Sequence, residues 1–231
     1  MNRVINVVRM QFVNRQAYVW VPVIVLTGSL GLTLAIYSII AGSGVQGPFY
    51  GGGAQAPLWC LLAVGVQALT LSFPFSQALS VTRKEFYLGT LLSAALTAMI
   101  LAAIFVVGGL IERITDGWGL NGYFFYLPWV WEHGPAAAAL VFFALAFGFF
   151  VLGFWAATVY KRWGTAVLTA ALVIPGLMLV AALWFIGRAN AWVQVGRWFA
   201  SQTAPGWALW GLLATAVLAG ISYLILRRLV P

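Results

Sequence analysis

The chain has 231 residues, of which 63% are hydrophobic and only 7% are charged. A soluble domain usually carries about 25% charged residues, so this composition excludes a water-facing globular surface. In a soluble protein the formal net charge of +8 would suggest nucleic acid as a ligand. Here the apolar blocks confine the charges to their ends, where they set membrane topology and meet anionic lipid.

Six apolar blocks, each about twenty residues or longer, have the length that crosses a hydrocarbon core of about 30 Å. They cover approximately residues 20–41, 57–80, 88–111, 136–159, 165–187 and 206–226. These blocks predict an all-α, polytopic membrane protein with six transmembrane helices. We expect the whole chain, 1–231, to form a single transmembrane domain.

The basic residues predict the topology. With the N-terminus in the cytoplasm, nine of the twelve basic residues fall in inner segments, and the opposite orientation reverses that ratio. Because cytoplasmic segments carry an excess of Lys and Arg, we expect both termini inside. The inner set is Arg3, Arg9, Arg15, Arg83, Lys84, Lys161, Arg162, Arg227 and Arg228, and the outer set is Arg113, Arg188 and Arg197.

Residues 2–16 precede the first block and have an amphipathic pattern. On a helical wheel one arc of about 100° holds apolar residues, and most of the polar residues lie opposite. The apolar arc contains Met1, Val4, Ile5, Val8 and Phe12, and the polar set is Asn2, Arg3, Asn6, Arg9 and Asn14. The pattern favours a short helix in the inner membrane interface, with its arginines at lipid headgroups. The alternative is a frayed basic tail that only orients the first span.

The expected outer segments differ in character. Residues 42–56 are uncharged and rich in glycine, which predicts a flexible connection. Residues 112–135 combine Glu112, Asp116 and Glu132 with seven aromatic side chains. Aromatic rings with polar atoms favour the membrane–water interface, so this segment is expected on the outer surface, as an aromatic belt or a substrate gate. Bulky residues at helical spacing in 188–204 predict a short interfacial or re-entrant helix.

Several kinds of chemistry are missing from the predicted spans. No Asp or Glu lies well inside a span, whereas ion-coupled transporters usually bury an ionisable residue on the ion path. The single cysteine, Cys60, and the single histidine, His133, argue against a disulfide framework, a metal cluster and a catalytic triad. There is no Walker A motif. We therefore expect no catalytic, cofactor-binding or metal-binding residues in this chain.

Polar and helix-distorting residues gather in the second and fifth blocks. Proline removes a backbone hydrogen bond and bends a helix, which suits a cavity or a moving seam. The alternative is ordinary hydrogen-bonded packing between helices. The candidate pathway or seam residues are Gln67, Thr70, Ser72, Pro74 and Pro175.

The string ALSVTRKEFYLGT connects the second and third blocks on the inner side. Thr82 can cap a helix, and Glu85, three residues later, completes a capping box. We expect Phe86, Tyr87 and Leu88 to present an exposed apolar and aromatic surface beside the two basic residues of the string. Such a surface suits docking on a soluble partner. The alternative is a charged turn that only fixes topology.

The same string resembles the loop after the second span in permeases of type-2 ABC exporters. In that family a small residue, a hydrophobic residue, Ser or Thr, two basic residues and a hydrophobic pair precede the next span. The family commonly has a glycine near the place where this chain has Ser80, so that position departs from the pattern. The wider plan is also similar, with an interfacial helix, six spans, both termini inside and re-entrant outer elements before the last span.

The resemblance implies a permease subunit of an ATP-driven exporter in the cytoplasmic membrane of a bacterial cell. Its partners would be a second permease subunit, identical or related, and a separate ATP-binding cassette subunit that binds ATP and Mg. Nucleic acid is not an expected partner. The residues implied to couple to the ATPase are Thr82, Arg83, Lys84, Glu85, Phe86 and Tyr87.

The apolar and aromatic character of the spans favours an amphipathic or hydrophobic substrate. One alternative is a non-transport membrane protein, for assembly or sensing, that binds a partner or lipid through its outer aromatic loops. A membrane enzyme that acts on lipids is a third possibility, which the lack of convergent polar residues disfavours.

Overall fold

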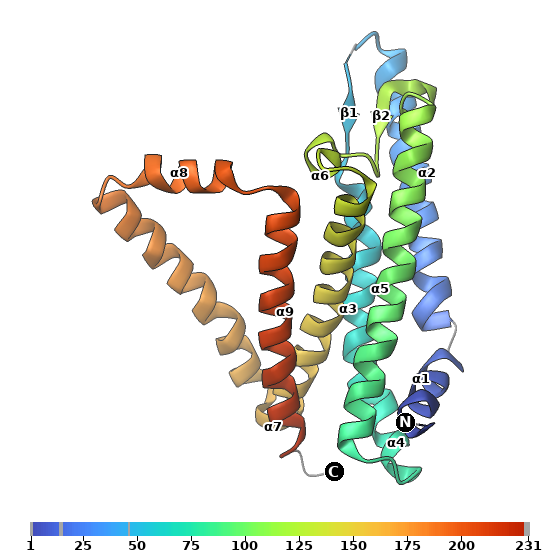
Figure 1. The fold of residues 1–231 in the computed structure, drawn as a ribbon, viewed down its shortest axis with the longest axis vertical. Coiled ribbons are helices and arrows are strands. Elements are labelled where there is room, and N and C mark those ends of the chain that lie inside the picture. The colour runs from blue at the N-terminus through green and yellow to red at the C-terminus, as the bar shows by residue number, and fades with distance from the viewer. Residues whose placement is uncertain (1, 14–15, 46, 229–231) are drawn as a thin grey trace.

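The computed structural model describes residues 2–13, 16–45 and 47–228, and most of this chain is helical (Figure 1). The first half contains α1 (Asn2–Val13), the π-helix η1 (Gln16–Trp20), α2 (Val21–Gly42), the 3-10 helix η2 (Gly52–Gln55), α3 (Ala56–Gln67), the π-helix η3 (Ala68–Ser72) and α4 (Phe73–Ala78). The second half contains α5 (Arg83–Ile114), the irregular turn η4 (Gly117–Asn121), α6 (Pro128–Trp131), α7 (Pro135–Arg188), α8 (Trp192–Ser201) and α9 (Ala204–Leu226). Two short strands, β1 (Phe49–Tyr50) and β2 (Gly122–Tyr123), pair in parallel.

Five helical stretches of the described chain are long and apolar enough to cross a membrane. They are Tyr18–Gly42, Gly52–Ala78, Arg83–Ile114, Pro135–Arg188 and Ala204–Leu226. The all-α class predicted from the sequence is therefore confirmed, and helices occupy all six predicted blocks. Two of those blocks, 136–159 and 165–187, fall within the single element α7.

Gly164 divides α7 into two arms. Its φ of 79° and ψ of −173° are not helical, and glycine adopts this conformation readily because it has no Cβ. The first arm, residues 135–163, runs beside α3 and α5. The second arm, residues 165–188, turns away from them and leads to α8 (Figure 1). The chain therefore reverses its direction at Gly164.

The first arm of α7 crosses α3 with the two backbones almost in contact. A Cβ added at Gly65 would overlap the carbonyl oxygen of Phe150, and one added at Gly153 would overlap that of Leu62. Small residues let apolar helices approach this closely, and the resulting van der Waals contact holds helices together where lipid supplies no hydrophobic drive. The two glycines thus set the geometry of the bundle.

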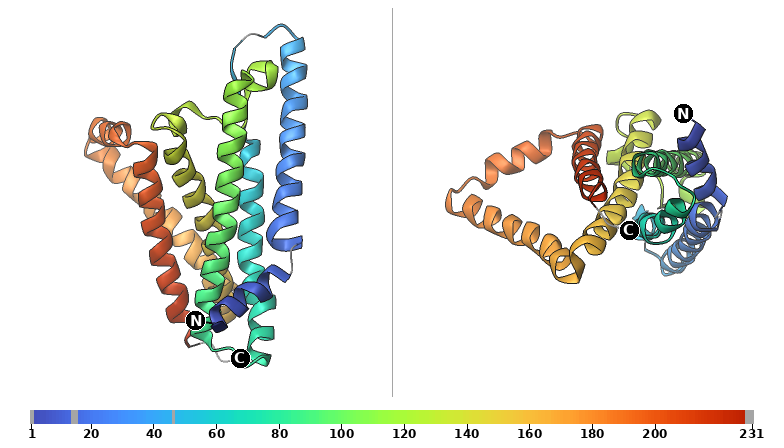
Figure 2. Two further views of the ribbon diagram at one scale, coloured as in Figure 1. Left: turned by 45° about the vertical axis from the view of Figure 1, so that its right-hand side comes forward. Right: turned by 90° about the horizontal axis from the view of Figure 1, so that it is seen from below.

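Helix α1 lies across one end of α5 (Figure 2). Val7 fits against Gly89, where an added Cβ would come within 2.6 Å of the Val7 side chain. Beside this contact the Gln11 Nε2 atom donates to the Thr90 hydroxyl at 2.7 Å. The packed face of α1 is therefore centred on Val7 and Gln11, which are both buried.

The predicted apolar arc of this segment was only partly correct. Val4, Val8 and Phe12 are half-buried, but Ile5 is exposed. The reason is that contacts with Gly89 and Thr90 of α5 set the orientation of α1. The residue pattern of α1 carries no information about those two positions. Met1, which was placed in the predicted arc, and Asn14 and Arg15 of the predicted segment lie outside the described residues.

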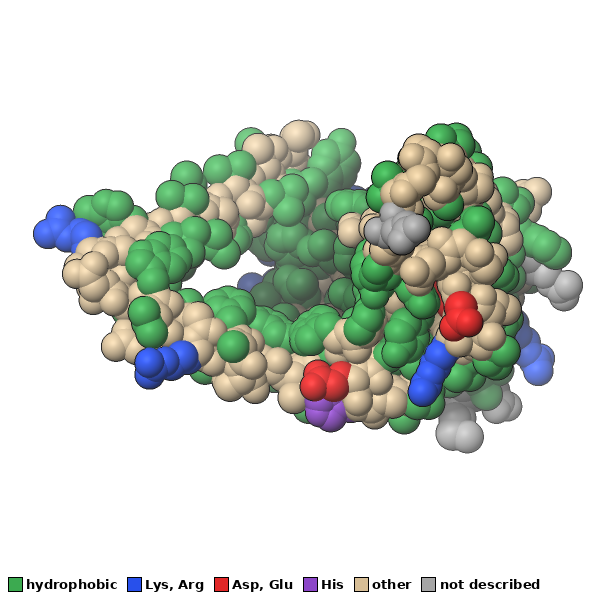
Figure 3. Space-filling view, turned by 90° about the horizontal axis from the view of Figure 1, so that it is seen from above, with side chains coloured by type: hydrophobic (Ala, Val, Ile, Leu, Met, Phe, Trp, Pro, Cys, Tyr) green, Lys and Arg blue, Asp and Glu red, His purple; other side chains and the backbone are tan. Residues whose placement is uncertain are grey.

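The second arm of α7 and helix α8 make little contact with the rest of the described chain. Along the second arm the large side chains are exposed: Val167, Leu172, Val173, Ile174, Leu177, Met178, Leu179, Val180, Leu183, Trp184 and Phe185. The space-filling view shows an opening on this side of the molecule, with hydrophobic side chains around it (Figure 3). An apolar surface of this extent requires lipid or another protein to cover it.

The crossing of α3 and α7 leads to a test with a matched control. Gly153→Ala is expected to destabilise the fold by about 1–3 kcal/mol, because the added methyl group must displace the backbone of α3. Gly220→Ala is the control, since nothing lies within 4 Å of a Cβ added there on α9. Denaturant unfolding in detergent, followed by tryptophan fluorescence, measures both. Equal stability of the two variants would contradict the close crossing.

Candidate functional site

A short turn between α4 and α5, residues 79–85, is the first candidate site, and we call it the capped turn. Ser80 has a left-handed backbone, with a φ of 57°. Thr82 donates from its backbone N–H and its hydroxyl to Glu85 Oε2, at 3.0 and 2.7 Å. In return the Thr82 hydroxyl accepts from the Glu85 N–H at 3.3 Å. The capping box predicted from the sequence is therefore confirmed.

The capped turn is tied to the last helix of the chain. Arg83 Nη1 donates to the carbonyl oxygen of Arg227 at 2.9 Å, where α9 ends. One turn into α5, the Tyr87 hydroxyl donates to the carbonyl oxygen of Ala219 at 2.6 Å. These two bonds join the beginning of α5 to α9 at two levels.

The expectation that Phe86, Tyr87 and Leu88 form an exposed surface holds only for Leu88, which is 43% exposed, and was wrong for the two aromatic residues. Phe86 is 0% exposed and packs edge to face on Phe73 of α4, with ring centroids 5.2 Å apart. Tyr87 is 7% exposed and lies against Phe154 and Tyr223. Large aromatic rings gain most from burial, and the first turn of α5 directs both rings into the bundle.

A signal for this burial was present in the sequence. The side chains at 86, 90, 93 and 97 recur at the spacing of one helix face, and all four are buried. Phe86 is therefore the first member of the packed stripe of α5. The surface that the capped turn leaves open consists instead of Leu79, which is 56% exposed, with Ser80, Thr82 and Lys84.

The candidate pathway residues do not come together within this chain. Gln67 and Pro74 are exposed on the helical stretch from α3 to α4, while Thr70 and Ser72 are half-buried there, in η3. Pro175 is exposed on the second arm of α7, which diverges from α3 (Figure 1). The Thr70 hydroxyl donates to the Val66 carbonyl oxygen at 3.0 Å, within its own helical stretch.

A second site lies at the opposite end of α5, and sequence reasoning missed it. The Glu112 side chain is 0% exposed. One carboxylate oxygen accepts from Trp118 Nε1 at 2.8 Å and from the Phe124 N–H at 3.0 Å. The other accepts from the N–H groups of Phe125 and Tyr126, at 2.7 and 2.8 Å. A buried polar group is tolerated when its hydrogen bonds are made, and here both oxygens are used.

The segment held by Glu112, residues 115–131, forms what we call the aromatic cap. Residues with positive φ reverse the chain after α5: Asp116, Gly117, Trp118, Gly119 and Asn121. The strand pair joins the cap to β1, which follows α2. In addition, the hydroxyl of Tyr37 on α2 donates to the Tyr123 carbonyl oxygen at 3.2 Å. Desolvation and then the Asp116 carboxylate raise the pKa of Tyr123.

Three of the seven aromatic residues of this segment turn inward, and three more, Trp118, Tyr123 and Tyr126, are half-buried. Gly108 and Gly109 of α5 leave room for the rings of Phe125 and Trp131. These two rings and that of Phe124 are buried. Trp129 is exposed, so the expected aromatic surface is accessible only in part. Glu112 thus explains the inward packing, because its carboxylate fixes the backbone that carries Phe124 and Phe125.

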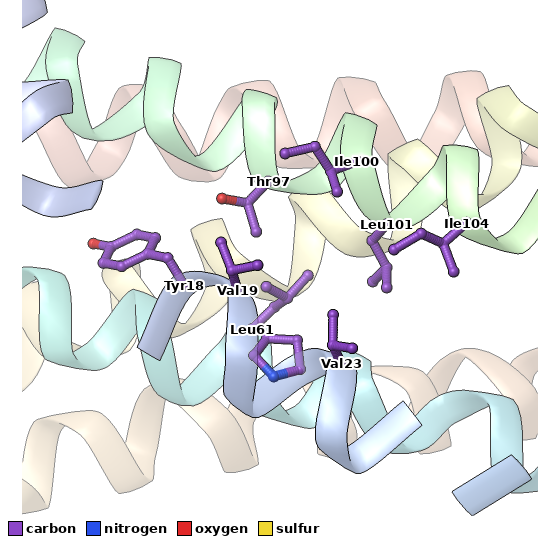
Figure 4. Close-up of a pocket in the computed structure, with 9 residues that line it drawn as sticks. Tyr18, Val19, Val23, Leu61, Thr97, Ile100, Leu101 and Ile104 are labelled. Atoms are coloured by element: carbon purple, nitrogen blue, oxygen red, sulfur yellow. The ribbon is translucent and has the colours of Figure 1, made fainter. Parts of the chain in front are cut away.

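The cavities of the described chain are mostly apolar grooves. One of about 380 Å³ lies between the first arm of α7 and α9, and one of about 570 Å³ lies between α5 and the first arm. A cavity of about 20 Å³ between η1, α2, α3 and α5 is shown in Figure 4. That volume admits about one water molecule. Among the described residues, no three His, Cys, Asp or Glu side chains come together to hold a metal ion.

Comparison with protein-family models, with curated proteins and with solved structures gave no match. The fold itself defines an all-α protein with five helices that could cross a membrane. Those helices indicate a multi-pass membrane protein.

The role of Glu112 in the aromatic cap can be tested directly. Glu112→Ala is expected to lower the free energy of unfolding by at least about 2 kcal/mol, because buried N–H groups lose their acceptor at about 1–3 kcal/mol each. Glu132→Ala is the matched control, since Glu132 is exposed, and its effect is expected to stay within about 0.5 kcal/mol. Denaturant unfolding measures both variants. A Glu112→Ala protein as stable as the control would show that the carboxylate does not hold the cap.

Proposed function

We propose that the chain is the permease subunit of an ATP-driven exporter of the type-2 ABC class. It would move an amphipathic or hydrophobic substrate across the cytoplasmic membrane, with energy from a separate ATP-binding cassette subunit. The observation that carries the proposal is the capped turn. It is a hydrogen-bonded, partly basic surface at the end of the bundle, and it contacts α4 and α9 as well as α5.

These contacts matter because a permease that has no nucleotide site of its own must be driven by conformational changes of its ATP-binding subunit. A force on Leu79 or Lys84 would act on α5 through the capping box. It would reach α9 through the bond from Arg83 to the Arg227 carbonyl oxygen, and α4 through the contact of Phe86 with Phe73. Phe86 and Tyr87 then take part in coupling as buried links between helices rather than as the docking surface itself.

The backbone of Ser80 supports the resemblance on which this proposal rests. Its φ of 57° is in the left-handed region, which glycine adopts at no steric cost. The permease family commonly has a glycine near this position, and the turn here has a backbone conformation that glycine favours. Ser80 therefore departs from the family pattern in residue type, at a position whose conformation suits a glycine.

We propose six membrane crossings with both termini in the cytoplasm. The second arm of α7 is about 36 Å long at about 1.5 Å per residue, which is enough to cross the hydrocarbon core. Crossing by both arms puts the capped turn, the Gly164 reversal and the end of α9 on one side, as their common position in Figure 1 suggests. That side then carries most of the basic residues. An ATP-binding subunit acts from the cytoplasm, so the docking test below also tests this orientation.

We propose that a second permease subunit buries part of the exposed apolar surface. The second arm of α7 has few neighbours in its own chain, and Pro175 lies on it. The candidate residues Gln67 and Pro74 are also exposed. Gln67, Pro74 and Pro175 lie apart within one chain, and an interface between two subunits would bring them together.

The alternative of a sensory or assembly protein that binds through outer aromatic loops has less support. Phe125 and Trp131 pack against glycines of α5, and Phe124 packs against Gly53 of η2. These rings would have to leave their buried positions before they could bind another molecule.

Substitutions on the open side of the capped turn test the proposed coupling. The double variant Leu79→Asp/Lys84→Glu is expected to lower the ATPase activity of the purified complex about tenfold or more, since losing a central contact costs about 2 kcal/mol. The unfolding temperature of the chain is expected to be unchanged, because both side chains are exposed.

The control for this experiment is Ile114→Asp/Arg113→Glu. It makes the same chemical changes at exposed positions on the far end of α5, and it is expected to leave ATPase activity within about twofold. Full activity in the capped-turn variant would contradict the proposal, as would the failure of any ATP-binding cassette subunit to co-purify with the native chain.

A further inference from the structure

The reversal of α7 contains two basic residues, and no Asp or Glu lies near them in the sequence. Lys161 and Arg162 directly precede Trp163 and Gly164. We call residues 160–164 the α7 corner. Between residue 133 and the end of the sequence there is no Asp or Glu. The two arms of α7 and the helices after them therefore supply no counter-charge for this corner.

Lys161 makes one long contact. Its Nζ atom lies 3.4 Å from the carbonyl oxygen of Leu69, at the long end of the range for a hydrogen bond. Leu69 belongs to the π-helix η3, a form that alters the regular backbone hydrogen bonding of a helix. An ammonium group has three N–H donors. The Lys161 side chain is exposed, so the charge remains accessible from outside the chain.

The hydrogen-bond donors of Arg162 are less well satisfied than those of Lys161. Its guanidinium carbon lies 4.9 Å from the centre of the Trp163 ring, in a cation–π contact. Its Nη1 atom is buried and has no hydrogen-bond partner within the part of the chain that the structure describes. A buried N–H donor without an acceptor is unfavourable. The corner thus combines two cationic groups with donors that lack acceptors.

We propose that the α7 corner binds the headgroup phosphate of an anionic phospholipid. Phosphate oxygens accept charge-assisted hydrogen bonds from both ammonium and guanidinium groups. On binding, the guanidinium would turn outward from its buried position, so that Nη1 gains an acceptor. The site goes beyond the transport proposal and needs no ATP-binding partner.

The surroundings favour a lipid over a free phosphate ion. Tyr160 and Trp163, on either side of the basic pair, are both exposed, and such rings prefer the level of lipid headgroups. Beyond them the second arm of α7 offers exposed apolar side chains, beginning with Val167. A phospholipid held at the corner by its phosphate can lay its acyl chains along this arm, and inorganic phosphate gains nothing there.

The test measures binding to the purified full-length chain in detergent. Phosphatidylglycerol and phosphatidylcholine with the same acyl chains are added in turn, and binding is followed by native mass spectrometry and by the shift in unfolding temperature. The native chain is expected to prefer phosphatidylglycerol. Lys161→Gln/Arg162→Gln is expected to weaken that binding about tenfold, while millimolar inorganic phosphate does not compete with it.

The control is Arg227→Gln/Arg228→Gln, which removes two charges from exposed side chains at the end of α9. It is expected to change phosphatidylglycerol affinity by less than about threefold, which would exclude a general charge effect. If the corner variant does not fold, Arg162→Lys keeps the charge and is expected to lose part of the affinity, because it lacks the guanidinium fork. Equal losses in both double variants, competition by inorganic phosphate, or no preference for phosphatidylglycerol would each overturn the proposal.

Discussion

Lipid gives two apolar helices no hydrophobic reason to associate, so this bundle depends on how closely its backbones approach each other. The controlling contact is the crossing of α3 with the first arm of α7, where Gly65 and Gly153 each face a carbonyl group of the other helix. A third glycine, Gly89, allows α1 to pack closely on α5, where it faces the Val7 side chain. Elements outside these crossings, above all the second arm of α7, remain largely exposed.

Helix α5 extends from the capped turn to the aromatic cap, and a carboxylate organises each end. Glu85 completes the capping box, and Glu112 accepts hydrogen bonds from the backbone N–H groups of the aromatic cap. The 32 residues of α5 form a helix about 48 Å long. A displacement of the capped turn would therefore move the aromatic cap as well, which is the property that a subunit driven from one face of the membrane needs.

The amino-acid sequence predicted the helices and their approximate ends, because block length and hydropathy are local properties. The capping box was predictable for the same reason, since Thr82 and Glu85 lie three residues apart. Glu112 was not recognised, because its partners depend on a left-handed reversal between residues 116 and 121. The packed face of α1 depends on Thr90, 79 positions from Gln11. The burial of Phe86 and Tyr87 depends on contacts with α4, α7 and α9, although the helical stripe at residues 86, 90, 93 and 97 already indicates it for Phe86.

Docking of the capped turn on an ATP-binding subunit is tested most directly by a photo-crosslinking amino acid at Leu79, which is exposed. Irradiation of whole cells, followed by mass spectrometry of the adduct, identifies the neighbour of the turn. The proposed function predicts an adduct with an ATP-binding cassette protein that contains a Walker A motif, and none with that protein when the crosslinker replaces Ile114. Adducts at position 79 that contain only lipid, or only a second copy of this chain, would contradict it.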